Sequence, residues 1–211
     1  LEFRRVLFRP GLMKHAGVRV LVVDDHSPDG TGEVAESLGR ESGGRVAVLH
    51  RTSNRGFGRS YLDGMRQALT EPVDVICQMD ADLSHDPAQL PDLIAASARA
   101  DLVIGSRYVP GGRIVNWPFR RHLLSRFANM YIRTVTRIGA RDCTSGYRCW
   151  RRETLASLPL DQFFSDGYSF LVEMLFAAAR RGSRIAEVPI TFVERREGES
   201  KVSRAVLLES A

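Results

Sequence analysis

Short apolar runs and amphipathic stretches alternate along the first half of the chain. The apolar runs are rich in β-branched residues and are bounded by turn residues, which predicts strands at 18–23, 46–49, 73–79 and 102–105. The stretches between them have the spacing of amphipathic helices, at 33–40, 60–69 and 86–98. This alternation predicts an α/β fold, with a mostly parallel sheet and helices on both of its faces.

The second half changes character after a flexible joint at Pro110-Gly111-Gly112. Its pattern predicts helices at 117–138, at 167–181 and from 204 onward, a short strand or turn at 149–150, and a strand at 185–193. Pro189 lies inside the last strand, and because proline cannot donate to a strand ladder, it predicts an edge strand or a bulge.

Two carboxylates, Asp80 and Asp82, follow the predicted strand 73–79. Strand residues i and i+2 point the same way, so both acids could face one cation. A Mg²⁺ ion held by one or two carboxylates is usually completed by substrate phosphates. The pair therefore predicts a metal-bridged nucleotide and a transferase, whereas the alternative interpretation is a solvated acidic turn.

Other polar side chains also fall at the carboxyl ends of predicted strands, where ligands of open α/β sheets gather. Asp25 could accept hydrogen bonds from a nucleoside, or it could instead cap the following helix. Arg107 follows a buried strand, and a cation there needs an anionic partner. That partner could be a substrate phosphate or sugar, or a structural ion pair.

The 211 residues suit one soluble domain, with 44% apolar and 26% charged residues. The net charge of +5 suits an anionic partner, whether a nucleotide, a phospholipid surface or nucleic acid. The positive charges interleave with acids and no nucleic-acid-binding motif is present, so we expect no nucleic-acid partner. The three cysteines form no C-x-x-C pair, which favours a reducing compartment.

Six motifs occur in the order found in family-2 glycosyltransferases of the GT-A (Rossmann-like) fold, and over roughly residues 17–211 the chain resembles that family. The motifs are Val22–Thr31, Asn54–Gly58, Asp80–Pro87, Gly105–Tyr108, Asp142–Arg148 and Phe192–Lys201. Within the family, the Ser27–Thr31 turn and the Gly198–Lys201 ending resemble the polyprenol (dolichol) monophosphate mannose synthases.

The resemblance implies a metal-dependent, inverting transfer of mannose from GDP-mannose to a polyprenyl phosphate, with Mg²⁺ or Mn²⁺ as cofactor. The alternative within the family is transfer from UDP-glucose or another sugar nucleotide. A lipid acceptor implies work at a membrane surface, on its cytoplasmic face, with a possible membrane-anchor subunit or domain.

The resemblance also implies roles for individual residues. The metal ligands are Asp80, Asp82 and Ser84, and the catalytic residues are Asp82 and Arg107. The donor-binding residues are Val23, Asp25, Asp80, Ala81, Asp82, Arg107, Arg195 and Lys201. The acceptor-phosphate residues are Arg120, Arg121 and Ser125, on a basic amphipathic helix that could instead be core-packed with a solvated arginine face.

The ends of the chain depart from the family pattern. Residues 1–9 resemble a translated sequencing adapter and are interpreted as non-native, the alternative being a basic amphipathic arm. We expect residues 10–211 to be a single family-2 catalytic domain, truncated at both ends. No residue of 1–17 matches the Pro-x-Tyr-Asn-Glu-like loop that follows the family's first strand, so we expect this strand to be missing.

Overall fold

The computed structural model describes residues 12, 15, 17–53, 55–165 and 167–194. They belong to two compact units, one within 1–73 and the other within 74–211, and each is described here by itself. The predicted helix from 204 onward, the adapter-like segment, and the donor-binding candidates Arg195 and Lys201 lie outside the described residues.

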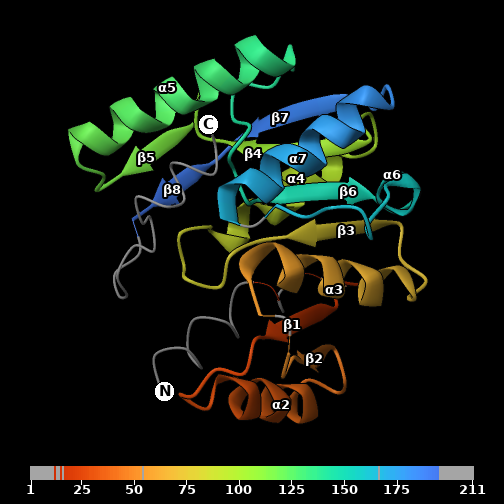
Figure 1. Cartoon of the computed structure of the whole chain (residues 1–211). Coiled ribbons are helices and arrows are strands. Elements are labelled where there is room, and N and C mark those ends of the chain that lie inside the picture. Colours follow the sequence, from red (N-terminus) through yellow and green to blue (C-terminus); the bar gives the residue numbers. More distant parts are fainter. Residues whose placement is uncertain (1–11, 13–14, 16, 54, 166, 195–211) are drawn as a thin grey trace. The chain divides into compact units, whose positions relative to one another are not determined.

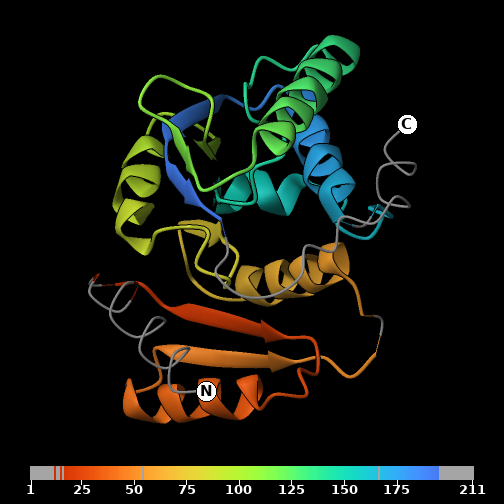
Figure 2. The ribbon, with the colours of Figure 1, turned by 90° about the vertical axis from the view of Figure 1, so that its left-hand side faces the viewer.

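The first unit is a two-stranded parallel sheet with one helix on each face (Figure 2). Its elements are β1 (Val20–Asp24), α2 (Thr31–Glu41), β2 (Val46–His50) and α3 (Phe57–Leu69), with Val20 opposite Val46. Neighbouring strand residues point to opposite faces. A Cβ added at Gly64 of α3 would lie 2.7 Å from Cγ2 of Val23, and one at Gly32 of α2 would lie 2.9 Å from Oδ2 of Asp24. Both helices therefore approach the sheet through a glycine.

The second unit is built on a four-stranded sheet with the order β3-β6-β4-β7. These strands are β3 (Val75–Gln78), β6 (Arg148–Arg151), β4 (Leu102–Ser106) and β7 (Ile185–Pro189). Strands β4 and β7 are parallel, whereas β6 lies between β3 and β4 and is antiparallel to both. Helices α4 (Leu90–Ala96) and α7 (Gly167–Arg180) cover opposite faces of this sheet (Figures 1 and 2).

Five further elements complete the second unit. Strands β5 (Arg113–Val115) and β8 (Thr191–Val193) form a small parallel pair, and the long helix α5 (Phe119–Thr136) follows β5. A 3₁₀ turn, η1 (Pro87–Gln89), precedes α4, and the Asp86 side chain caps it by accepting from the Ala88 N–H. The short helix α6 (Arg152–Ser157) follows β6.

The predicted α/β class with parallel pairing is confirmed, since three of the five strand pairings among the described residues are parallel. Pro189 ends the edge strand β7, as its lack of an N–H donor predicts. The predicted strand 185–193 is in fact two strands, because buried Ile190 between them turns its N–H to Ser106 of β4. Strand β5 and helix α6 were not predicted.

The core of the second unit contains a buried cation, Arg148. The Arg148 side chain is fully buried and donates to three backbone carbonyls, those of Cys143, Ser145 and Leu171. A buried charge is tolerated when its hydrogen-bonding groups are satisfied. Arg148 thereby fixes the 143–145 loop against α7, and this loop carries part of the site described next.

Candidate active site

The acidic pair lies in a loop that folds back on itself after β3. The strand ends at Gln78, so strand alternation does not set the directions of Asp80 and Asp82; the loop's own hydrogen bonds do. The Asp80 N–H donates to Nδ1 of His85 at 3.1 Å, and Oδ1 of Asp82 accepts from the Ser84 N–H at 3.0 Å. Leu83, between them, has a left-handed backbone with φ 67°. The loop is thus a defined turn rather than a solvated acidic tail.

His85 is the buried centre of this loop and was not predicted as a site residue. It is 2% exposed, and its ring packs against Tyr147 and Phe192, with centroids 5.1 and 5.4 Å away. Burial lowers the pKa of His85, against the raising effect of the Asp80 charge. Because Nδ1 accepts from Asp80, the neutral ring carries its proton on Nε2.

The Asp80 carboxylate lies against Gly146 of the 142–148 loop. A Cβ on Gly146 would lie 3.4 Å from Oδ2 and 3.5 Å from Oδ1 of Asp80, which is ordinary van der Waals contact. Two carboxylates one residue apart suit a hard divalent cation whose other ligands come from a substrate. Within the described residues, no group of three or more His, Cys, Asp or Glu side chains could hold a metal ion by itself.

Arg107, directly after β4, forms a buried bidentate ion pair with Asp142. Its Nε and Nη2 donate to the two carboxylate oxygens at 2.7 and 2.6 Å, and its backbone N–H donates to Oδ2 at 2.9 Å. Burial alone would lower the pKa of Arg107, but the charge and hydrogen bonds of Asp142 outweigh it and raise the pKa. The structure therefore contains the structural ion pair that was the alternative for Arg107, and a substrate contact stays a prediction.

Aromatic rings surround the Arg107 guanidinium. Its Cζ lies 5.4 Å from the ring centroids of Tyr108, Trp117 and Phe192. Cation–π contacts at this distance stabilise a charge that is partly removed from water. The ion pair and the rings together fix the guanidinium in one orientation.

The acceptor-phosphate candidates lie on or near the first turns of α5. Arg121 forms an ion pair with Glu194 and lies 4.3 Å from the Trp117 ring centroid. The Oγ of Ser125 accepts a hydrogen bond from the Tyr108 hydroxyl at 2.7 Å, and Tyr108 is the residue after Arg107. Arg120 is exposed. Arg121, Ser125 and Arg107 therefore belong to one contiguous set of contacts in the second unit.

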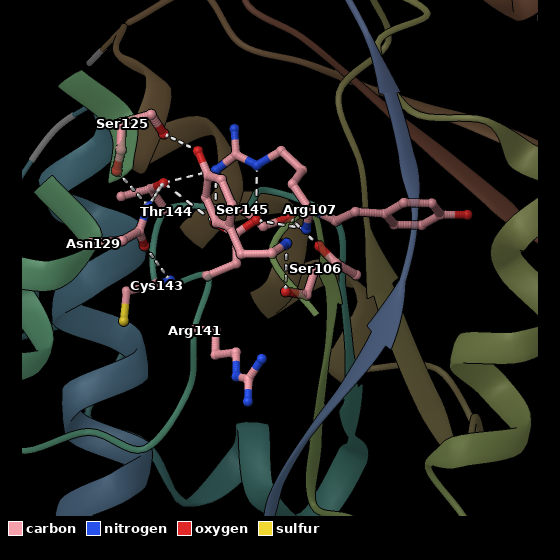
Figure 3. A network of polar contacts seen from close by, with 12 residues as sticks. Ser106, Arg107, Ser125, Asn129, Arg141, Cys143, Thr144 and Ser145 are labelled. Carbon is pink, nitrogen blue, oxygen red and sulfur yellow. Dashed lines mark hydrogen bonds and ion pairs between the residues drawn. The ribbon is translucent and has the colours of Figure 1, made fainter. Parts of the chain in front are cut away.

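This set extends to three polar residues that were not assigned roles from the sequence, namely Asn129, Asp142 and Thr144. Asn129 and Thr144 are labelled in Figure 3. The Thr144 Oγ1 accepts from Nη2 of Arg107 at 2.8 Å and from Nδ2 of Asn129 at 3.3 Å. The backbone of Asp142 is also fixed, because its N–H donates to Oε1 of Glu187 on β7.

The donor-binding candidates of the first unit lie at the end of β1. Oδ1 of Asp25 accepts from Arg51 at 2.5 Å, and Oδ2 accepts from the N–H of Gly56, the residue before α3. Asp25 is not the cap of α2, whose N-cap is Gly30. Val23 packs against α3 at Gly64. Asp25 is thus a rigidly held carboxylate, and its contact with a nucleoside stays a prediction.

A cavity of about 430 Å³ lies beside Arg51, between the end of β2 and the outer side of α3. It is lined by Leu49–Ser53 and by Asp63, Arg66, Gln67 and Thr70. Neither Asp25 nor Val23 lines it, so the nucleoside contacts predicted from the sequence do not coincide with this cavity.

Helix α5 presents a broad apolar surface to solvent. The exposed large side chains on it are Phe119, Leu123, Leu124, Phe127, Met130, Tyr131 and Val135. Phe119, Leu123, Phe127 and Met130 recur at intervals of three or four residues and form one stripe, which arginines flank. Among the described residues, no helix combines the length and apolarity needed to cross a bilayer.

Known proteins with similar sequences place this site in a family. The chain is 51% identical over 90% of its length to an undecaprenyl-phosphate mannosyltransferase of Micrococcus luteus, of which the alignment covers 78%. It is 47% identical over 95% of its length to a polyprenol monophosphomannose synthase of Mycolicibacterium smegmatis, covering 77% of that protein.

Solved structures support the fold. Glucosyl-3-phosphoglycerate synthase of Mycobacterium tuberculosis, with Mn²⁺, UDP and phosphoglyceric acid, has a TM-score of 0.63 at 21% identity, covering 91% of this chain and 67% of that one. Its complex with Mg²⁺ and UDP has a TM-score of 0.62 at 20% identity, covering 90% and 67%. At these identities the likeness confirms the predicted fold alone.

Residues 7–158 match the family described as Glycosyl transferase family 2. The chain therefore belongs to glycosyltransferase family 2, as its motifs predict.

Proposed function

We propose that this protein transfers mannose from GDP-mannose to a polyprenyl phosphate, with inversion at the anomeric carbon. The observation that carries the proposal is the identity of about half of all aligned residues to two proteins named for mannose and a polyprenyl acceptor. The acidic loop after β3 and the fixed cation Arg107 supply the chemistry that a sugar diphosphate needs.

On the donor side, Asp80 and Asp82 hold Mg²⁺ or Mn²⁺, with Ser84 contributing directly or through water. The two solved complexes that contain Mn²⁺ or Mg²⁺ together with UDP support a divalent ion in this fold. When bound, the ion offsets the negative charge of the leaving diphosphate.

The remaining donor contacts are distributed over several segments. Asp25, held by Arg51 and Gly56, accepts from the nucleoside, and Val23 lies next to the base. Ala81 is exposed between the two acids, where its backbone can contact the sugar-nucleotide donor. Arg195 and Lys201, outside the described residues, contact the diphosphate.

In the reaction, an oxygen of the acceptor phosphate attacks the anomeric carbon of mannose. The bond from that carbon to the diphosphate oxygen breaks, and its electron pair leaves with GDP. The phosphate oxygen is already anionic near neutral pH, so no strong general base is needed. The residues act by positioning and by electrostatic stabilisation.

On the acceptor side, Arg120, Arg121 and Ser125 contact the lipid phosphate. The exposed apolar stripe of α5 rests in the membrane interface and its flanking arginines meet the phospholipid head groups. We propose that the protein works at the cytoplasmic face of a membrane, where a membrane-anchor subunit or domain could assist it.

One alternative donor has support from the fold. The similar solved structures include complexes with UDP-glucose, so transfer of glucose to a polyprenyl phosphate is the second candidate.

Donor identity is tested with labelled GDP-mannose or UDP-glucose, Mg²⁺ and a polyprenyl phosphate, by counting label in the organic phase. We expect label from GDP-mannose that is blocked by excess GDP and by a chelator. Label only from UDP-glucose would select the alternative, and label from neither would refute both.

A further inference from the structure

We propose that Asn129 is a positioning residue that fixes α5 on the Arg107–Asp142 ion pair and so sets the place of the lipid phosphate. The inference rests on the proposed function, because it assigns α5 to the acceptor. It concerns how a helix on a membrane is coupled to a cation in the site, and none of the sequence motifs or relatives assigns a role to Asn129.

Asn129 is the only residue of α5 that is fully buried, being 3% exposed. Most helices are held to their domain by apolar side chains on their inner face. On α5 the large apolar side chains are instead exposed. The attachment of α5 to the second unit therefore includes one buried polar side chain, Asn129, in addition to the Tyr108–Ser125 hydrogen bond and the Arg121–Glu194 ion pair.

The amide oxygen and both amide N–H groups of Asn129 each have a hydrogen-bond partner. Its Oδ1 accepts from the Cys143 N–H at 2.7 Å, while its Nδ2 donates to the Ser125 carbonyl at 2.9 Å and to Thr144 Oγ1 at 3.3 Å. A side chain of the same shape but without the amide N–H groups could satisfy only the first contact. Asparagine is therefore specified by its chemistry and not only by its size.

Two short paths lead from Asn129 to Arg107 (Figure 3). In the first, Thr144 Oγ1 accepts hydrogen bonds from both Nδ2 of Asn129 and Nη2 of Arg107. In the second, the Ser125 carbonyl accepts a hydrogen bond from Asn129 Nδ2. The Ser125 Oγ accepts one from the hydroxyl of Tyr108, the residue after Arg107. The helix turn 125–129 is thus attached to both sides of the Arg107 cation.

This arrangement has a consequence for acceptor binding. Arg121 and Ser125 lie on the same helix as Asn129, so a shift of α5 would move them relative to Arg107. Loss of the Asn129 amide should therefore weaken productive binding of the lipid phosphate while leaving the binding of the sugar nucleotide nearly unchanged.

The test compares Asn129→Asp, Asn129→Ala and the control Thr134→Ala in the whole chain. Asn129→Asp keeps the acceptor for Cys143 but loses both donor contacts. Thr134 is exposed on the same helix and bonds only to the Met130 carbonyl. We expect both Asn129 variants to raise KM for the polyprenyl phosphate about tenfold or more, with KM for GDP-mannose changed less than about twofold. Equal changes in both KM values, or no change, would overturn the proposal.

Thr144 provides a second pair of variants should Asn129→Ala fail to fold. Thr144→Val removes the shared oxygen and should show the same selective effect on the acceptor, whereas Thr144→Ser keeps the oxygen and should restore it. A loss of acceptor affinity in Thr144→Ser as large as in Thr144→Val would show that the hydroxyl is not the link.

Hydrogen–deuterium exchange separates this proposal from the proposed function. If the wild-type protein transfers no mannose, the function is refuted, but positioning can still be measured directly. Asn129→Asp should speed amide exchange in α5 and not in α7, and Thr134→Ala should not. Unchanged exchange of α5 in Asn129→Asp would refute the attachment itself.

Discussion

The two carboxylate oxygens of Asp142 accept from two different nitrogens of Arg107, and the Asp142 side chain is completely buried. A buried ion pair of this geometry is stable only while both charges are present, because either one alone would be left without compensation in a poorly polarisable interior. Substitution of either residue of the pair should therefore be costly to stability.

We expect Asp142→Asn to destabilise the protein by roughly 3–5 kcal/mol, since it leaves the Arg107 charge buried without its counter-ion. Asp101→Asn is the matched control: Asp101 also binds an arginine in bidentate fashion, but Arg184 is largely exposed. The control should cost about 1 kcal/mol or less. Urea denaturation measures both, and equal losses would contradict the special status of the buried pair.

Asp82→Asn tests the acidic loop. The amide keeps an acceptor for the Ser84 N–H but loses the charge that a divalent cation needs, so the fold should persist while turnover falls by about 100-fold or more. Asp92→Asn, on the exposed side of α4, is the control and should retain wild-type turnover. Initial rates at saturating donor and Mg²⁺ decide it, and wild-type turnover in Asp82→Asn would refute the metal role.

The positions of Asp80, Asp82 and Arg107 could be predicted because each follows a short apolar run, and such runs indicate strands from local sequence alone. Their partners could not. Asp142 lies 35 residues from Arg107, and although it opens one of the six motifs, nothing in the local sequence pairs it with Arg107. Only the tertiary fold brings the two segments together.

The antiparallel strand β6 shows the same limit. Its sequence Arg-Cys-Trp-Arg has a charge at each end, and only the two central residues predicted a strand or turn. The burial of Arg148 was missed because arginine is typical of surfaces. Two of its carbonyl partners, Ser145 and Cys143, lie only three and five residues away, whereas the third, Leu171, lies 23 residues away and cannot be identified from local pattern.

Gly64→Ala should destabilise the first unit by about 1–3 kcal/mol. The new Cβ would lie 2.7 Å from Cγ2 of Val23, so α3 would have to move away from β1. Gly139→Ala is the control, because a Cβ there meets no atom within 4 Å. Thermal unfolding of both variants measures the difference, and an unchanged Tm for Gly64→Ala would show that α3 does not need this close approach.

Stability should fall as pH rises from about 9 toward 11. Burial raises the pKa of the Cys143 thiol to about 11. Near pH 9 and above, the unfolded chain ionises this thiol while the folded chain keeps it protonated, so the unfolded state gains stability. The midpoint of urea unfolding at pH 8 and pH 10 measures the effect. Cys143→Ala should show a smaller decrease, and an identical decrease in the variant would assign the effect to other groups.

The exposed apolar stripe of α5 predicts membrane binding. Phe127 is 58% exposed, so replacing it should not cost core packing, and Phe127→Asp should weaken binding to anionic vesicles by about tenfold. The matched control is Phe164→Asp, since Phe164 is 87% exposed but lies outside α5. Co-sedimentation with vesicles measures both variants. If the stripe is the membrane contact, only Phe127→Asp should release the protein, because a general effect of added negative charge would act on both variants alike.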